Sequence, residues 1–218
     1  MARTAAACRR PIRSACDPHP PITGRVGCCA SMDDVLPASL LWTLLGAVIY
    51  PLWLAAGVAD VLVHWRDRIE CRAGTRESAM HLLMCLQMGV PVLAVLFLEV
   101  TAPVFLLSTA LVALHGWTSW RDSRFADSVR RIGPTEQKIH VALDAVPWFG
   151  LALIALLHRD TLVPLLQAGP ADWSVRWREP PFARATIITV LLTSAVFGVL
   201  PSALELARAW RTVRRAAL

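Results

Sequence analysis

Long runs of apolar residues dominate the chain from residue 36 onward, and short polar segments separate them. A membrane span needs roughly 20 mostly apolar residues. Five runs approach or exceed this length, and they cover about 36–59, 80–98, 102–117, 139–157 and 185–204. They are rich in Leu, Ala and Val and lack the alternation of apolar and polar positions that membrane barrels show. The pattern therefore predicts an all-α integral membrane protein with about five transmembrane helices.

The apolar stretch from Leu82 to Gly116 is too long for a single span. Glu99 interrupts it, and Thr101 and Pro103 are residues that commonly stand at the start of a helix. We therefore expect two spans joined by a tight hairpin. Spans 1 to 4 are expected to form an antiparallel four-helix bundle.

Composition supports the membrane assignment, because 56% of the residues are hydrophobic and soluble domains carry fewer apolar residues and more charge. Residues 1–35 differ from the rest, with five Arg, four Cys and four Pro and no long apolar run. This segment is expected to be a disordered tail, or to precede a true start at Met32. The cysteine spacing in it fits no zinc pattern well. The predicted membrane domain is then 36–218.

Lys and Arg are concentrated on one side of the five-span topology. Thirteen lie on the side that contains the C-terminus, against four in the segments of the other side and five more in the N-terminal tail. The positive-inside rule places the richer side in the cytoplasm. We expect a multi-pass protein of the plasma (inner) membrane with a cytoplasmic C-terminus. Topology and anionic lipid head groups account for the net charge of +6, so no nucleic-acid partner is expected.

Four histidines lie at the cytoplasmic ends of spans 1 to 4, each with a carboxylate four or seven residues away. Residues at these spacings share one face of a helix. Because the spans alternate in direction, the four ends come to about one depth. The predicted metal ligands are Asp60, His64, Glu77, His81, His115, Asp122, Glu136 and His140.

This ligand set suits iron, manganese or zinc, and di-iron carboxylate bundles gather Glu and His from facing helices in the same way. We expect two metal ions, iron in the first place. The competing interpretation of each acid and histidine is a helix cap or dipole partner. Asp144, Arg131 and Glu70 are expected to surround the ligands, and Glu205 to pair with Arg208. Segment 119–133 is expected to be an interfacial helix over the site.

The pattern D-x3-H, E-x3-H, H-x6-D, E-x3-H over about residues 55–150 resembles an uncharacterised family of small bacterial integral membrane proteins. In its logic it is also similar to membrane fatty-acid desaturases and hydroxylases, which gather iron with histidine boxes at the cytoplasmic ends of their spans. The paired H-x-x-H-H boxes of those enzymes are absent here, and carboxylates replace half the histidines, so no catalytic residue carries over. The resemblance implies a metal site at the cytoplasmic face that acts on lipid-like molecules.

The expected function is a di-iron oxidoreductase of the hydroxylase or desaturase type, with membrane lipid around it, a lipid-like substrate and an electron donor. A zinc-dependent membrane hydrolase is the first alternative, although the motif H-E-x-x-H is missing. A haem protein is disfavoured, because haem ligation needs no carboxylates beside the histidines. A non-enzymatic metal carrier would require polar residues deep along several spans.

Overall fold

The structure is a computed structural model, and it describes residues 37–71 and 74–216. Helices make up most of this part, and the strand pairing within it is limited to one isolated antiparallel bridge between Leu98 and Trp177. The predicted all-α membrane fold is confirmed. The expectations for residues 1–35, including the start at Met32, concern a segment outside the described residues.

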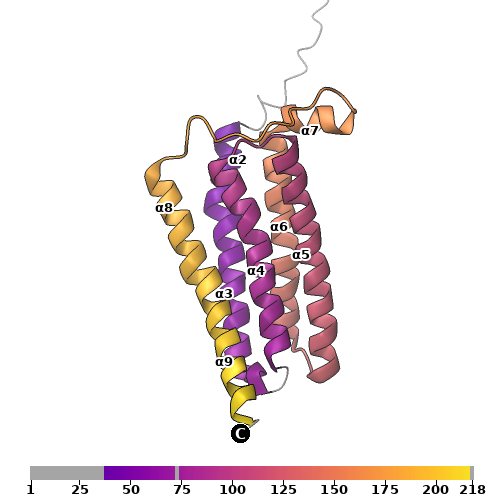
Figure 1. The fold of residues 1–218 in the computed structure, drawn as a ribbon, viewed down its shortest axis with the longest axis vertical. Coiled ribbons are helices and arrows are strands. Elements are labelled where there is room, and N and C mark those ends of the chain that lie inside the picture. Colours follow the sequence, from indigo (N-terminus) through magenta and orange to yellow (C-terminus); the bar gives the residue numbers. More distant parts are fainter. Residues whose placement is uncertain (1–36, 72–73, 217–218) are drawn as a thin grey trace, which may run out of the picture. The chain divides into compact units, whose positions relative to one another are not determined.

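Five helical segments are long and apolar enough to cross a membrane (Figure 1). Span 1 joins α2 (Ala38–Leu44), the π-helical segment η1 (Leu45–Ile49) and α3 (Tyr50–Asp67), and a short 3-10 helix, η2 (Ile69–Cys71), follows it. Spans 2, 3 and 4 are α4 (Gly74–Phe97), α5 (Ala102–Val129) and α6 (Pro134–Leu157). After the short helix α7 (Arg159–Leu166), span 5 joins α8 (Arg184–Thr193), the π-helical segment η3 (Ser194–Val199) and α9 (Leu200–Ala216).

The five spans pack side by side in a bundle, and their contacts define the order of the helices around it. Helix α3 packs on α6, α6 on α5, α5 on α4, and α4 on α9, while α9 also reaches α3. Span 5 is therefore a full member of the bundle and contacts both span 1 and span 2.

Span 3 is longer than its apolar run predicts. The run ends near residue 117, yet α5 continues as one helix to Val129. Segment 119–133 therefore does not form a separate interfacial helix; most of it is the last turns of span 3. The physical reason is packing, because Ser119, Asp122 and Ala126 in these turns are buried against the bundle and tertiary contacts override local polarity.

The hairpin between α4 and α5 lies where the sequence predicts it, with Thr101 just before the helix and Pro103 in its first turn. The Thr101 hydroxyl does not cap α5 but donates a hydrogen bond of 2.6 Å to the Ser174 carbonyl. Residues 167–183, which we call the strap, cross this end of the bundle (Figure 1). The Arg178 N–H donates to the Phe97 carbonyl at 2.8 Å, so the strap satisfies backbone groups that the end of α4 would leave open.

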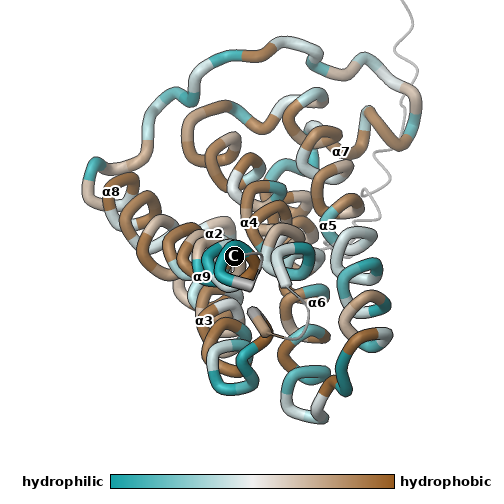
Figure 2. Tube along the Cα trace, turned by 60° about the horizontal axis from the view of Figure 1, so that its bottom comes forward, coloured by the Kyte–Doolittle hydropathy of each residue, from teal (hydrophilic) through white to brown (hydrophobic). Residues whose placement is uncertain are grey.

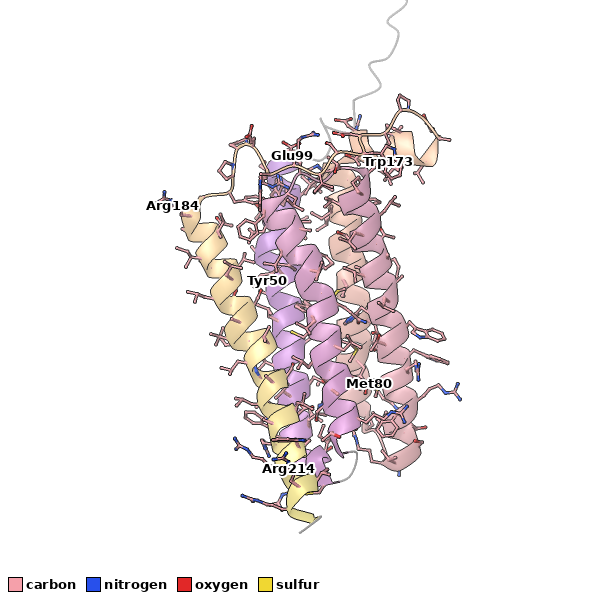
Figure 3. All side chains as sticks on the ribbon, viewed as in Figure 1. Tyr50, Met80, Glu99, Trp173, Arg184 and Arg214 are labelled. Carbon is pink, nitrogen blue, oxygen red and sulfur yellow. The ribbon has the colours of Figure 1, made fainter. Side chains whose placement is uncertain are left out.

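Apolar side chains face outward along the middle of the helices, as in Leu86, Leu107 and Ile188, and hydrophilic residues gather at the helix ends (Figure 2). Arg214 and Met80 lie toward one end of the bundle, and Glu99, Trp173 and Arg184 lie at the other (Figure 3). We call the end at which α9 terminates, with Arg211, Arg214 and Arg215, the arginine-rich end.

A candidate metal centre

Nine ionisable residues inside the bundle form one buried cluster near the arginine-rich end. Every span contributes to it, because each span carries an acid or a histidine on the face that packs against its neighbours. The cluster consists of Asp60 and His64 from α3, Glu77 and His81 from α4, Asp122 from α5, Arg130 directly after α5, Glu136 and His140 from α6, and Glu205 from α9.

His64 and His81 form a stacked pair at the centre of the cluster. Their ring centroids lie 4.6 Å apart, and the rings are nearly parallel, at 8°. Glu205 joins them, since its Oε1 lies 2.9 Å from His81 Nδ1 and its Oε2 lies 3.4 Å from His64 Nδ1. His64 Nε2 lies 3.1 Å from Glu136 Oε1, and His81 Nε2 lies 3.1 Å from Asp122 Oδ2. Every ring nitrogen of this pair therefore faces a carboxylate from another helix.

Arg130 holds two of the carboxylates in place. Its Nη2 lies 2.5 Å from Glu77 Oε1 and also bonds Glu136 Oε1, while its Nη1 lies 2.9 Å from Glu136 Oε2. Burial lowers the pKa of Arg130, but the hydrogen bonds to Glu136 and Glu77 outweigh it and raise that pKa above its usual range. The guanidinium is thus a permanent cation between spans 2 and 4.

Asp60 lies beside two imidazoles without completing a hydrogen bond to either. Its Oδ1 is 3.2 Å from His140 Nε2 and 3.6 Å from His64 Nε2, yet this buried oxygen has no hydrogen-bond partner among the described residues. Three potential ligand atoms from two helices therefore converge on one small volume, which is a geometry that a cation can occupy.

Two groups of three residues bring their ligand atoms within 4.8 Å of one another: Asp60, His64 and His140, and also His64, Glu77 and His81. They share His64. A neutral imidazole ligates a metal through one nitrogen, so a second ion would depend on His81 with the carboxylates around it.

Charge gives a second constraint on the cluster. When ionised, its five carboxylates and one guanidinium leave an excess of four negative charges in a buried volume. Such an excess is costly inside a membrane protein unless cations or protons offset it. Protons on His64, His81 and His140 would offset three of the four charges, and two divalent ions would offset all four with the histidines neutral.

The structure brings seven of the eight predicted ligands into this cluster, but it pairs most of them differently from the sequence expectation. The spacing predicts an acid and a histidine side by side on each helix. The closest contacts instead run between helices, from Asp122 to His81, from Glu136 to His64 and from Asp60 to His140.

His115 is the predicted ligand that lies outside this cluster, whereas Asp122 and Glu136 belong to the cluster but to neither group of three. Its Nε2 lies 3.4 Å from the Leu143 carbonyl. Among the residues expected around the ligands, Asp144 lies close enough to His115 to act on it electrostatically. Arg131 is exposed, and Glu70 lies in η2 with its side chain outside the described part.

Two members of the cluster are not in the predicted ligand set. Glu205 is the one acidic residue of span 5, and an acid within a span is by itself a signal of a functional site. The guanidinium of Arg208, its expected partner, lies 5.3 Å from the Trp65 ring centroid. The sequence gives no such signal for Arg130, because nothing in it distinguishes Arg130 from the adjacent Arg131.

A cavity of about 70 Å³ adjoins the cluster. Asp60, His81 and His140 line it on the side of the cluster, and Trp53 and Phe197 line it on the side nearer the middle of the spans. The space thus connects the ionisable residues with the apolar interior of the bundle.

Comparison with known proteins gives no assignment of this centre, since no protein-family model, no curated protein and no solved structure matches the chain.

Proposed function

We propose that this chain is a metal-dependent integral membrane enzyme whose buried cluster holds two metal ions, with iron as the first choice. The reaction is an oxidation or reduction of a lipid-like substrate, of the hydroxylase or desaturase type. The observation that carries the proposal is the buried cluster of five carboxylates and three imidazoles with a single guanidinium.

Charge favours two ions over one. A single divalent ion leaves two buried negative charges that protons on histidines or carboxylates must offset, and a protonated imidazole cannot ligate a metal. Two ions allow His64, His81 and His140 to be neutral ligands. One ion would lie among Asp60, His64 and His140, and the other at His81 with Glu77, Glu205 or Asp122.

The chemistry of the donors favours iron or manganese over softer metals, because imidazole nitrogens and carboxylate oxygens supply the whole set and no thiol takes part. Zinc accepts the same ligands. Bound iron would supply the redox chemistry. Around it, Arg130 holds Glu77 and Glu136 in place, and Glu205 fixes the ring orientation of His64 and His81.

The position of the cluster supports a lipid-like substrate and a cytoplasmic electron donor. The cluster lies within spans rather than in a loop, and helix α8 of span 5 has no buried residue, so this helix is accessible to lipid along its length. The excess of Lys and Arg at the same end favours a cytoplasmic location of the centre by the positive-inside rule.

Metal analysis of the purified protein tests the proposal. Iron, zinc and manganese per chain are measured in the wild type and in the variants His64→Ala, His81→Ala and His140→Ala. Loss of a residue that supports a metal ligand typically weakens metal affinity about 10–100-fold. Each of the three variants removes a proposed ligand itself, so its metal affinity should fall by at least that factor. His158→Ala is the matched control, because His158 follows α6 at the opposite end of the bundle.

Two metal ions per wild-type chain, with loss in the three variants alone, would support the proposal. A wild type that takes up no metal under any loading condition would overturn it. Equal loss in His158→Ala would also overturn it, because the effect would then come from general destabilisation.

A further inference from the structure

The cavity beside the cluster runs along the helices toward the middle of the membrane. Trp53, Gly57 and Asp60 are four and three residues apart on α3 and therefore share one face, and all three line the cavity. On α4 the lining continues from His81 to Cys85. One end of the cavity is thus formed by ionisable groups, and the other by apolar and aromatic side chains.

Four buried side-chain atoms of residues that line the cavity lack hydrogen-bond partners among the described residues, and two of them, Asp60 Oδ1 and Asp122 Oδ1, belong to the cluster. The other two belong to Trp53 and His115. The Trp53 indole N–H is buried and has no acceptor among the described residues. His115 Nδ1 is likewise buried without a hydrogen bond there, although the Met84 carbonyl lies near this imidazole. Buried groups of this kind are costly to leave unpaired. Because both residues line the same cavity, they are positioned to bind a polar atom within it.

The two groups differ in what they offer. An indole N–H can only donate. His115 Nε2 lies 3.4 Å from the Leu143 carbonyl, which only accepts. A neutral imidazole that donates to this carbonyl through Nε2 presents a lone pair at Nδ1. A hydroxyl group satisfies both, since its oxygen accepts from Trp53 and its hydrogen is donated to His115.

The size and the wall of the cavity define the rest of the ligand. About 70 Å³ exceeds the roughly 10–15 Å³ that one water requires by the same measure, and it holds only a few heavy atoms. Phe197 lines the cavity and also exposes 48% of its surface on the outside of the bundle, so its ring stands between the cavity and the bilayer. A larger apolar molecule can insert one end past Phe197 and leave the remainder in lipid.

From these contacts we infer that the cavity binds the hydroxyl end of a long-chain alcohol that enters from the bilayer, with Trp53 and His115 holding the oxygen. Identification of this alcohol as the substrate rests on the proposed function. The binding itself depends only on the cavity and on the unpaired groups of Trp53 and His115.

Photo-cross-linking in nanodiscs tests the inference. The probe is a long-chain primary alcohol with a diazirine near its hydroxyl end, and the competitors are the unlabelled alcohol and the alkane of equal length. Cross-links should appear on residues that line the cavity in spans 1 and 5. The alcohol should abolish them, while the alkane should compete much more weakly.

Two variants with matched controls locate the binding. A Cβ at Gly57 or at Gly89 meets no atom within 4 Å, but of the two only Gly57 lines the cavity. Gly57→Leu should therefore abolish capture, and Gly89→Leu should not. Trp53→Phe removes one hydrogen bond and should weaken capture roughly two- to tenfold. Trp148→Phe, in an exposed position outside the cavity, should leave capture unchanged.

Equal competition by alkane and alcohol, or full capture by Gly57→Leu, would overturn the inference. Metal content measured on the same samples separates this result from a failure of the proposed function. A metal-loaded protein that does not capture the alcohol contradicts the inference alone. Selective capture by a protein without metal supports the inference and contradicts the proposed function.

Discussion

Glu205 connects the two central histidines through its two oxygens, one to each ring. The change Glu205→Gln keeps the size of the side chain and removes its charge. Because it leaves one nitrogen of each imidazole without its anionic partner, we expect metal content to fall at least about tenfold. Metal per chain is the measurement. Glu99→Gln is the control, because Glu99 pairs with the exposed Arg176 at the other end and should retain wild-type metal.

Arg130 and Arg131 provide a comparison between adjacent residues of one type. Arg130→Gln leaves Glu77 and Glu136 buried without their cation, and breaking a buried ion pair costs about 3–5 kcal/mol. For a chain of this size that corresponds to a fall in Tm of roughly 6–20 °C. Arg131 is exposed, so Arg131→Gln should change Tm by about 2 °C at most. Thermal unfolding in detergent measures both, and equal Tm values for the two variants would contradict the role given to Arg130.

At the scale of elements, the strap depends on charges that lie outside the spans. Backbone and side-chain hydrogen bonds from Ser174, together with Arg176, lower the pKa of Asp172 from 3.8 to about 2. A lowered pKa in the folded state means that this contribution is fully present above about pH 4 and is lost as the pH falls through about 2.

Fluorescence of Trp173, the residue after Asp172, should therefore stay constant from neutral pH down to about 4 and change only below that value. In Asp172→Asn, the change between about pH 4 and 2 should disappear. A transition in the wild type near neutral pH would show that another group controls the strap.

Sequence patterns locate the helices well, but they do not show which residues of a helix are buried against its neighbours. Apolar runs locate all five spans, because the bilayer sets the length of a spanning helix. The same runs underestimate α5, which continues past Trp117 because Asp122 and Ala126 are buried by neighbouring helices. No local pattern reports such a contact.

In the candidate site, too, the sequence predicts which residues come together but not how they pair. Helical spacing places Asp60 and His64 on one face, and the depth of the motifs follows from the alternation of the spans. Which acid meets which histidine depends on the order of helices around the bundle, and a single sequence does not contain that order. For this reason the contact from Asp122 to His81 and the central place of Glu205 emerge only from the structure.

At the scale of the whole molecule, the distribution of Lys and Arg predicts the orientation in the membrane. The excess of Lys and Arg at the arginine-rich end predicts a cytoplasmic C-terminus. A reporter that is active only in the cytoplasm should be active when fused after Leu218 and inactive when inserted within the strap. The reverse result would place the cluster on the outer side of the membrane and would exclude a cytoplasmic electron donor.

The contribution of span 5 to the cluster has a consequence for biosynthesis. Ribosomes deliver the spans to the membrane in order, so the nascent chain holds His64 and His81 in the bilayer before Glu205 has been translated. Until then, these rings lack the carboxylate that joins them in the finished protein. A chain that stops before span 5 would retain four inserted spans with this defect, and ionisable groups without partners are costly inside a membrane.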